Sequence, residues 1–407
     1  MTKQRYLTLI LVLGSLTAIG PFSIDMYLPG FRAIAESLHT TTENVALSLS
    51  SFFIGISAGQ LLYGPLLDRF GRKRPLYFGL SLYIIASVGC YFAGSIQMLV
   101  GLRFVQAIGS CAAAVASMAM VRDLFPVKDS AKVFSLLILV LSASPLIAPT
   151  VGGYVTVSFG WHVIFLILAT IAVLITLAVI FILPESYPPD PSYSLAPGPI
   201  IGSFLGVLKT PQFYTYCFCG ALAFSGLFAY ISASPIVFME GFKVSAKSYG
   251  WIFAILSVGF IGSSQVNSRL IKKYKSEQIV NTALIALVVI AVAFLIGAIQ
   301  GGLGLVGTTA MIFGVLCCVG LIAPNTSALA LAPFEKNAGV AASLLGASQM
   351  AIGAMVSVGI SLFKSKSAVP MASIIIVSSA MALCLVLIGR QFIKTKVAAK
   401  QGGMEAH

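Results

Sequence analysis

One acidic side chain lies within a long apolar stretch. Asp25 falls between Pro21 and Pro29, in an apolar run that begins near position 7, whereas Glu240 lies only at the edge of such a run. A carboxyl group held in a low dielectric resists ionisation, so it can gain and lose a proton near neutral pH. We therefore expect Asp25 to bind and release a proton. The open alternative is that its helix ends at Pro29, which would leave Asp25 as a capping or solvated group.

A basic side chain lies within another apolar stretch. Arg103 is followed one helical turn later by Gln106, and both fall in the run 98–121. A cation within an apolar span is costly, so Arg103 should face a cavity or a partner. Since Arg103 is close to one end of the run, its long side chain could instead reach the interface with water.

Charged residues of both signs cluster in one short connection, which reads GPLLDRFGRKRP from Gly64 onward. Gly64 lets its helix approach a neighbour closely, and Gly71 permits a sharp turn. Asp68 can pair with a nearby cation, for which Arg122 is a candidate, or with the positive N-terminal end of a helix. The alternative is that the basic residues of this connection only set the orientation of the chain.

Small residues and prolines recur in the run 132–156, which reads SPLIAPTVGG from Ser144 onward. Small residues allow two helices to approach closely, and Pro149 is expected to kink the helix that contains it. We therefore expect this run to pack tightly against another helix. Packing alone, with no further role, is the simpler interpretation.

The elements that position these groups must be membrane helices. The chain is 58% hydrophobic and only 9% charged, with a mean hydropathy of +1.00, whereas a soluble domain carries roughly 25% charged residues. An apolar helix of ~20 residues crosses a bilayer, and twelve such runs follow one another from about 7–34 to 369–390. The net charge of +13 is spread over short clusters between these runs, which argues against nucleic acid as a partner.

The connections set the expected topology. Lys and Arg concentrate in alternate connections, such as 69–74 and 269–275, so we place these and both termini in the cytoplasm. Dense prolines in 184–210 cannot continue a helix, although 200–209 could form a short one. The predicted parts are a six-helix half (1–183), a cytoplasmic linker (184–210), a second six-helix half (211–391) and a cytoplasmic tail (392–407).

Several chemistries find no support in the sequence. It has no Gly-x-x-x-x-Gly-Lys phosphate-binding loop, so ATP is not the expected energy source. Its seven cysteines form no Cys-x-x-Cys pair and have no histidine at metal-ligand spacing. We therefore expect no metal, no cofactor and no enzymatic activity, and the proton exchange expected at Asp25 makes a proton gradient the expected energy source.

Three of these patterns resemble motifs of the major facilitator superfamily. The connection from Gly64 resembles motif A, the run around Arg103 resembles motif B, and the run from Ser144 resembles motif C of proton-driven drug exporters. Within the superfamily motif C is associated with antiporters. Ser144 and Ala148 stand where motif C has glycine, so the match in this run is imperfect.

Shorter strings resemble one branch of that superfamily. DMYLP from Asp25 and VRDLF from Val121 are similar to the bicyclomycin/chloramphenicol resistance (Bcr/CflA) branch of bacterial drug:proton antiporters. The resemblance implies an all-α membrane protein of twelve transmembrane helices in two pseudo-symmetric six-helix halves. It also implies multi-pass insertion in the bacterial inner membrane, monomeric function, and export of drug-like molecules in exchange for protons as the halves rock.

The expected site residues form four groups. Proton coupling is assigned to Asp25 and Arg103. The substrate cavity is assigned to Phe22, Tyr27, Phe53, Gln106, Phe224 and Phe228. The latch implied by the resemblance consists of Gly64, Asp68, Arg69, Gly71, Arg72, Arg122 and Asp123, and the antiporter motif consists of Pro145, Pro149, Gly152 and Gly153.

Two other functions stay open at this point. A proton-coupled symporter that takes up a nutrient or metabolite would use the same fold, and motif C argues against it only as far as that motif matches. A membrane-embedded enzyme or sensor is disfavoured, because the sequence has no nucleophile–base pairing and no appended signalling domain.

Overall fold

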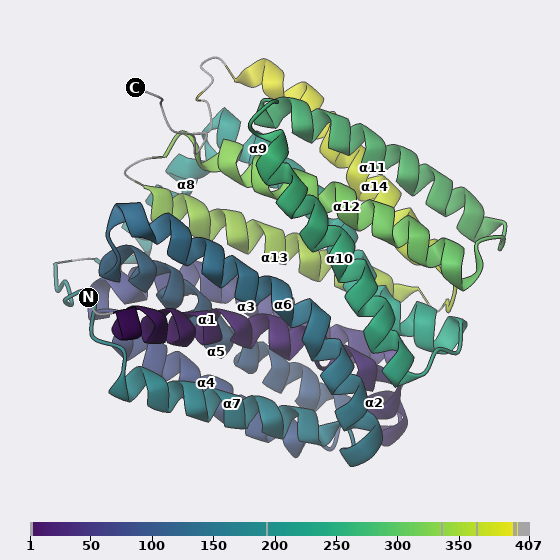
Figure 1. Ribbon diagram of the computed structural model, residues 1–407, viewed down its shortest axis with the longest axis horizontal. Coiled ribbons are helices and arrows are strands. Elements are labelled where there is room, and N and C mark those ends of the chain that lie inside the picture. The colour runs from purple at the N-terminus through teal and green to yellow at the C-terminus, as the bar shows by residue number, and fades with distance from the viewer. Residues whose placement is uncertain (1–2, 193, 335–336, 364, 394–396, 398–407) are drawn as a thin grey trace. The chain divides into compact units, whose positions relative to one another are not determined.

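Every regular element in the described part of the chain is a helix (Figure 1). The computed structural model describes residues 3–192, 194–334, 337–363, 365–393 and 397, without the side chains of 3, 127–132, 135, 138, 139 and 142. Most of the predicted tail 392–407 lies outside these residues. The elements are α1 (Lys3–Asp25), η1 (Leu28–Gly30), α2 (Phe31–Ser37), α3 (Thr42–Phe70), α4 (Lys73–Tyr91), α5 (Ile96–Leu124), α6 (Val127–Phe159), α7 (His162–Phe181), α8 (Pro197–Leu208), α9 (Pro211–Ser234), η2 (Pro235–Gly241), α10 (Ala246–Leu270), α11 (Ser276–Ile299), α12 (Gly304–Leu331), α13 (Ala338–Leu362), α14 (Val369–Gly389) and η3 (Arg390–Phe392).

Ten helical segments of the described chain are long and apolar enough to cross a membrane. The first combines α1, η1 and α2 over Gln4–Ser37, and the other nine are α3, α5, α7, α9 with η2, α10, α11, α12, α13 and α14 with η3. Helices α4 and α6 are not among the ten. The chain is thus a multi-pass membrane protein, whereas the count of twelve spans and the cytoplasmic position of the termini stay predictions.

Caps and glycine turns set several helix boundaries. The hydroxyl of Ser95 accepts a hydrogen bond from the amide of Met98 at the start of α5, which satisfies one of the free amides of a helix N-terminus. Gly71, after α3, has φ +80°, and Gly160, between α6 and α7, has φ +86°. This left-handed conformation is strained for side chains with a Cβ, so Gly71 forms the sharp turn that the sequence predicts.

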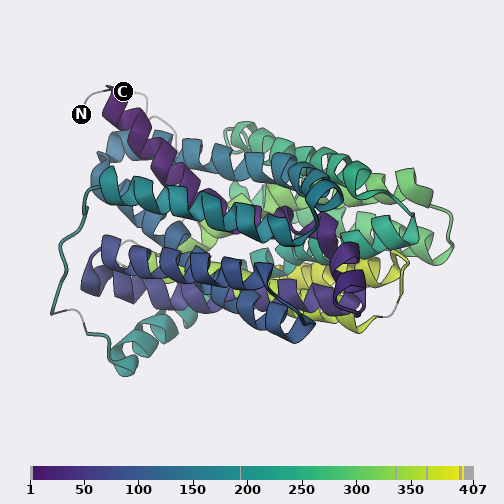
Figure 2. The same cartoon turned by 90° about the horizontal axis from the view of Figure 1, so that it is seen from below.

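The chain divides into two compact units. The first comprises 1–200 together with 245–254, and the second comprises 201–244 together with 255–407. Between α7 and α8 the described residues have no regular structure (Figure 2). The short helix predicted over 200–209 is confirmed by α8, while the predicted domain boundaries stay predictions.

One helix lies at the centre of each unit. In the first unit α5 packs against α1, α3 and α4, and small residues bring the backbones together, since a Cβ added to Gly55 of α3 would lie 2.6 Å from the Cβ of Ala107. In the second unit α9 packs against α12, α13 and α14. In the most apolar 18-residue stretch of each span, 83% of the residues are buried inside the protein for Pro211–Gly241, which contains α9, against 28% for α11.

Candidate functional site

The first transmembrane segment is interrupted directly after its acidic residue. Helix α1 ends at Asp25, a turn follows, and the chain resumes as η1 and then α2. Pro29 lies in η1, where its fixed backbone angle and missing amide are tolerated better than inside a long helix. Asp25 is only 5% exposed, so the alternative of a solvated group is wrong, although α1 does end, at Asp25 itself and not at Pro29. From the sequence we expect the first helix to continue past Pro29. The chain is helical again beyond Pro29, in α2, but α1 itself has already ended at Asp25.

The carboxyl group of Asp25 has one identified polar neighbour. The hydroxyl of Ser144, a fully buried residue of α6, lies close to it but has no hydrogen-bond partner among the described residues. Among the described residues, no basic side chain forms an ion pair with Asp25. Burying an unpaired charge is costly, so the neutral carboxyl suits this site and the ionised form needs water or a cation. The carboxylate of Asp25 can thus be protonated and deprotonated without breaking an ion pair.

Helix α6 approaches the interruption of α1 at backbone distance. It continues through Pro145 and Pro149 without a break in the helix. Gly152 faces the carbonyl oxygen of Met26, and a Cβ at position 152 would overlap that oxygen. The glycine is therefore required by the packing of α6 against the residue that follows Asp25, which confirms the expected close helix contact.

Gly152→Ala is expected to destabilise the protein by about 1–3 kcal/mol, the usual cost of overpacking. The added methyl group must push α6 away from the backbone of Met26, which has little freedom to move. Gly101→Ala in α5 is the matched control, because nothing lies within 4 Å of its added Cβ. Thermal unfolding of the purified variants compares them, and equal unfolding temperatures would contradict the packing argument.

Arg103 is fully buried in the first unit, so the alternative that it reaches the interface is wrong. Its guanidinium donates to Oε1 of Gln106 at 2.7 Å and to the carbonyl oxygen of Ser23 at 3.0 Å. The guanidinium carbon lies 4.7 Å from the ring centroid of Tyr27 and 4.1 Å from that of Phe52, a geometry that favours a cation–π attraction. Nε has no hydrogen-bond partner among the described residues.

Hydrogen bonds extend from Arg103 and its neighbour Gln106 to two further helices, α1 and α4. Gln106 donates from Nε2 to the Ser87 hydroxyl at 2.7 Å, and Ser87 donates to the carbonyl oxygen of Tyr83 at 2.7 Å. The Tyr83 hydroxyl lies 2.6 Å from that of Ser23. This network ties α4 and α5 to the last turn of α1, two residues before Asp25, and thereby fixes the position of the interruption.

The remaining residues expected to line a cavity lie in both units. Tyr27 and Phe53 are fully buried, Phe22 is half-buried, and the Tyr27 hydroxyl lies 2.7 Å from that of Ser48. In α9, the rings of Phe224 and Phe228 are in edge contact, with centroids 5.3 Å apart. Since each unit is described by itself, a shared substrate cavity stays a prediction.

The charged connection after α3 forms a compact ion-pair cluster. Arg72 donates from Nη1 to Asp68 and from Nε to Asp123, each at 2.8 Å. Burial acts to lower the pKa of Arg72, but the hydrogen bonds and charges of Asp123 and Asp68 outweigh it, so the net pKa is raised. The cation paired with Asp68 is thus Arg72, whereas the expected partner Arg122 is exposed. Gly64 lies in α3 itself.

The start of the linker holds this cluster in place. The Glu185 carboxylate accepts hydrogen bonds from the amides of Arg72, at 2.8 Å, and Lys73, at 3.1 Å. Ser186 donates to Asp123 at 2.9 Å, and the Tyr187 ring centroid lies 4.3 Å from the Arg72 guanidinium carbon. Arg69 donates to the carbonyl oxygen of a fourth linker residue, Asp190, at 3.5 Å. Sequence reasoning missed these contacts, and the only available signal was an acidic residue at the end of an apolar run.

Glu185→Ala is expected to weaken the start of α4 by roughly 0.5–2 kcal/mol, the range for a lost N-terminal cap. Hydrogen exchange at the amides of Arg72 and Lys73 measures the effect directly. Glu36→Ala is the control, since Glu36 pairs with Arg32 on an exposed surface and such pairs contribute little. Unchanged exchange at Arg72 and Lys73 would show that the Glu185 contacts do not stabilise the turn.

Comparison with known proteins places the chain among transporters. The family model of the Major Facilitator Superfamily matches residues 13–360. A Haemophilus influenzae protein named bicyclomycin resistance protein homolog is 35% identical over 89% of this chain and 91% of its own length. A Pseudomonas aeruginosa protein named chloramphenicol resistance protein is 29% identical over 81% of this chain and 78% of its own.

A solved structure agrees with the fold. The crystal structure of a D-xylose-proton symporter superposes with a TM-score of 0.71 and covers 98% of this chain and 100% of the symporter chain. The identity is 16%, so this likeness bears on the fold alone.

Proposed function

The chain belongs to the major facilitator superfamily, in the branch of the bicyclomycin and chloramphenicol resistance proteins, and on this basis we propose that it exports drug-like molecules in exchange for protons. It is a transporter and not an enzyme. The location is the bacterial inner membrane. The working unit is a monomer, with the proton gradient as energy source and no cofactor.

The observation that carries the proton-coupling proposal is the buried carboxyl at the interruption of α1. Asp25 is 5% exposed and lies two residues after Ser23, whose carbonyl oxygen accepts from Arg103. A carboxyl that is shielded from water and free of an ion pair changes its charge most readily by exchanging a proton. A cation substrate and a proton would then compete for the same group.

Transport follows from two states of the protein, open to the inside and open to the outside, that differ in their affinities for protons and for substrate. Protons bind from the outside and substrate from the inside, and each shifts the equilibrium by its differential affinity for the two states. In this proposal α4 and α6 also cross the bilayer, which gives twelve spans in two halves with both termini in the cytoplasm. The Arg72 cluster, with Asp68 and Asp123, serves as the cytoplasmic latch between states.

Export of a preloaded fluorescent cation and of an amphenicol from cells tests this function. Efflux is measured with the proton gradient intact and after its collapse by an uncoupler, in cells with and without the protein. Gradient-dependent efflux of either compound supports the proposal. Accumulation of a compound driven by the gradient would instead support a proton-coupled uptake symporter.

A further inference from the structure

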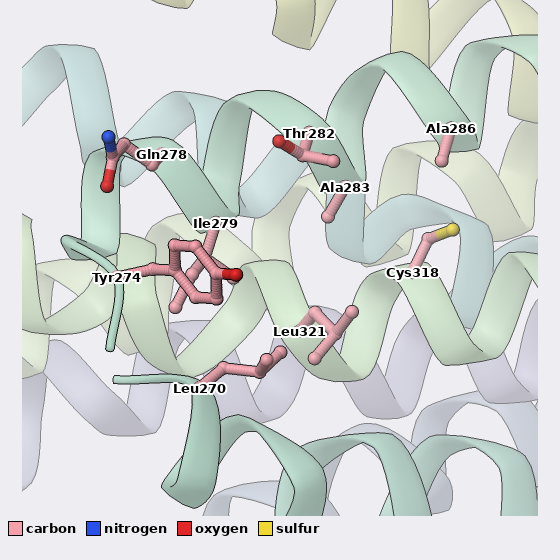
Figure 3. Close-up of a pocket in the computed structure, with 9 residues that line it drawn as sticks. All are labelled: Leu270, Tyr274, Gln278, Ile279, Thr282, Ala283, Ala286, Cys318 and Leu321. Atoms are coloured by element: carbon pink, nitrogen blue, oxygen red, sulfur yellow. The ribbon is translucent and has the colours of Figure 1, made fainter. Parts of the chain in front are cut away.

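A cavity of about 420 Å³ lies between α10, α11 and α12 in the second unit, apart from all residues assigned above (Figure 3). This volume is in the range of small-molecule sites, roughly 300–1,000 Å³. The residues that line it are Leu270, Tyr274, Gln278, Ile279, Thr282, Ala283, Ala286, Cys318 and Leu321.

The lining is mainly apolar; Tyr274 and Gln278 are polar side chains at one end, here called the mouth, and Thr282 is a third polar residue between the two ends. In Figure 3, Tyr274 and Gln278 lie at one end, and Ala286 and Cys318 lie at the other. Tyr274 is 52% exposed, whereas Ile279 is buried in the wall. Small side chains on α11 leave the interior open. An occupant must therefore combine a polar end with an apolar segment.

Basic residues adjoin the lining residues at the mouth in sequence. Arg269, Lys272, Lys273 and Lys275 are all exposed, and they flank the lining residues Leu270 and Tyr274 in sequence. None of these four makes an ion pair within the described chain. The nearest acidic residue in sequence, Glu277, accepts instead from the hydroxyl of Tyr216 at 3.4 Å. The connection at the mouth thus carries a net positive charge, four basic residues against the one acidic residue Glu277.

Backbone hydrogen bonds fix the connection that carries these charges. The amides of Lys273 and Tyr274 each donate to the carbonyl oxygen of Leu270 at 2.9 Å. Gln278, a lining residue, accepts from the amide of Lys275 at 3.1 Å. The basic residues are therefore held on a defined turn beside the cavity.

We propose that this cavity binds an anionic phospholipid of the cytoplasmic leaflet. The phosphate lies among Arg269, Lys272, Lys273 and Lys275, and one acyl chain enters the apolar interior. Basic pockets between membrane helices on the cytoplasmic side bind such headgroups. A soluble phosphate has no apolar group that could fill the apolar part of the cavity. The proposal rests on the cytoplasmic position of the connection 271–275 and not on the exported substrate.

Native mass spectrometry of the purified full-length protein tests the proposal, with dioleoyl phosphatidylglycerol and dioleoyl phosphatidylcholine as probes. Binding of phosphatidylglycerol should be preferred. Lys272→Gln with Lys273→Gln is expected to weaken it roughly 30-fold, since each basic residue near an anionic surface contributes about 1 kcal/mol. Lys209→Gln with Lys243→Gln, both exposed positions in the same unit, is the matched control and should leave binding unchanged.

A second variant tests the apolar part without changing the charge. Ala286→Phe fills the interior and should reduce occupancy by both lipids, and Ala286→Leu provides a smaller change if the first variant unfolds. Glycerol phosphate at equal concentration should not displace the lipid. Equal binding of the two lipids, no effect of the lysine substitutions, or full displacement by glycerol phosphate would each overturn the proposal. All of these readouts are independent of drug export.

Discussion

Asp25→Asn is expected to abolish the dependence of export on the proton gradient. Asparagine has nearly the size of aspartate but cannot take up or release a proton at this position, so the two transport states lose their different affinities for protons. Coupling free energies of about 1–3 kcal/mol correspond to factors of roughly 5–150. We therefore expect the gradient-driven part of the efflux rate to decrease by a factor in this range. Efflux from preloaded cells under an imposed pH gradient measures it.

Two comparisons separate loss of coupling from loss of folding. Exchange of substrate across proteoliposomes with no gradient should persist in Asp25→Asn, because the substrate still moves between the two states. Glu240→Gln is the matched control, since Glu240 pairs with Lys366 at 3.1 Å and lies at the edge of its span. If efflux stays gradient-dependent in Asp25→Asn, another residue of the chain must carry the coupled proton.

A milder variant probes the neighbour of this carboxyl. Ser144→Ala removes a buried hydroxyl close to Asp25 that has no hydrogen-bond partner among the described residues, but it keeps the carboxyl that carries the proton. A hydrogen bond that this hydroxyl formed to Asp25 during transport would contribute about 1.5 kcal/mol at most, so efflux is expected to fall by about tenfold at most. A loss as large as in Asp25→Asn would mean that Ser144 itself takes part in proton transfer.

Local chemistry made part of this site predictable from the sequence. The cost of a charge in an apolar helix singled out Asp25 and Arg103, and both are buried as that cost requires. The turn at Gly71 and the close contact at Gly152 follow from the absence of a Cβ. In each case the residue type alone restricts its surroundings strongly.

Contacts between distant segments were not predictable in the same way. Glu185 lies more than a hundred positions from the Arg72 amide that it binds, and no periodicity relates a linker residue to a turn in another helix pair. The choice of Arg72 over Arg122 as the partner of Asp68 depends on the turn at Gly71, which brings Arg72 back towards the end of α3. Such choices depend on three-dimensional packing and leave little trace in spacing.

Arg103→Met is expected to abolish export while changing stability only slightly. Methionine relieves the desolvation of a buried cation, which costs several kcal/mol. It also removes two hydrogen bonds from a charged donor, each contributing about 1.5–3 kcal/mol, and cation–π contacts with Tyr27 and Phe52 of about 2 kcal/mol when desolvated. These effects oppose each other and are similar in size, so the unfolding temperature should shift by only a few degrees.

Export should be lost for a separate reason. Without the guanidinium, the carbonyl oxygen of Ser23 has no donor to hold it, and the interruption of α1 that carries Asp25 is no longer fixed. Arg103→Lys keeps the charge but supplies a point donor in place of the planar fork, and should retain intermediate activity. Arg103→Ala adds a cavity, at a further cost of about 2–5 kcal/mol, and should lose both stability and export. Normal export by a stable Arg103→Met protein would reduce Arg103 to a packing residue, because the charge and its bond to Ser23 would then be dispensable.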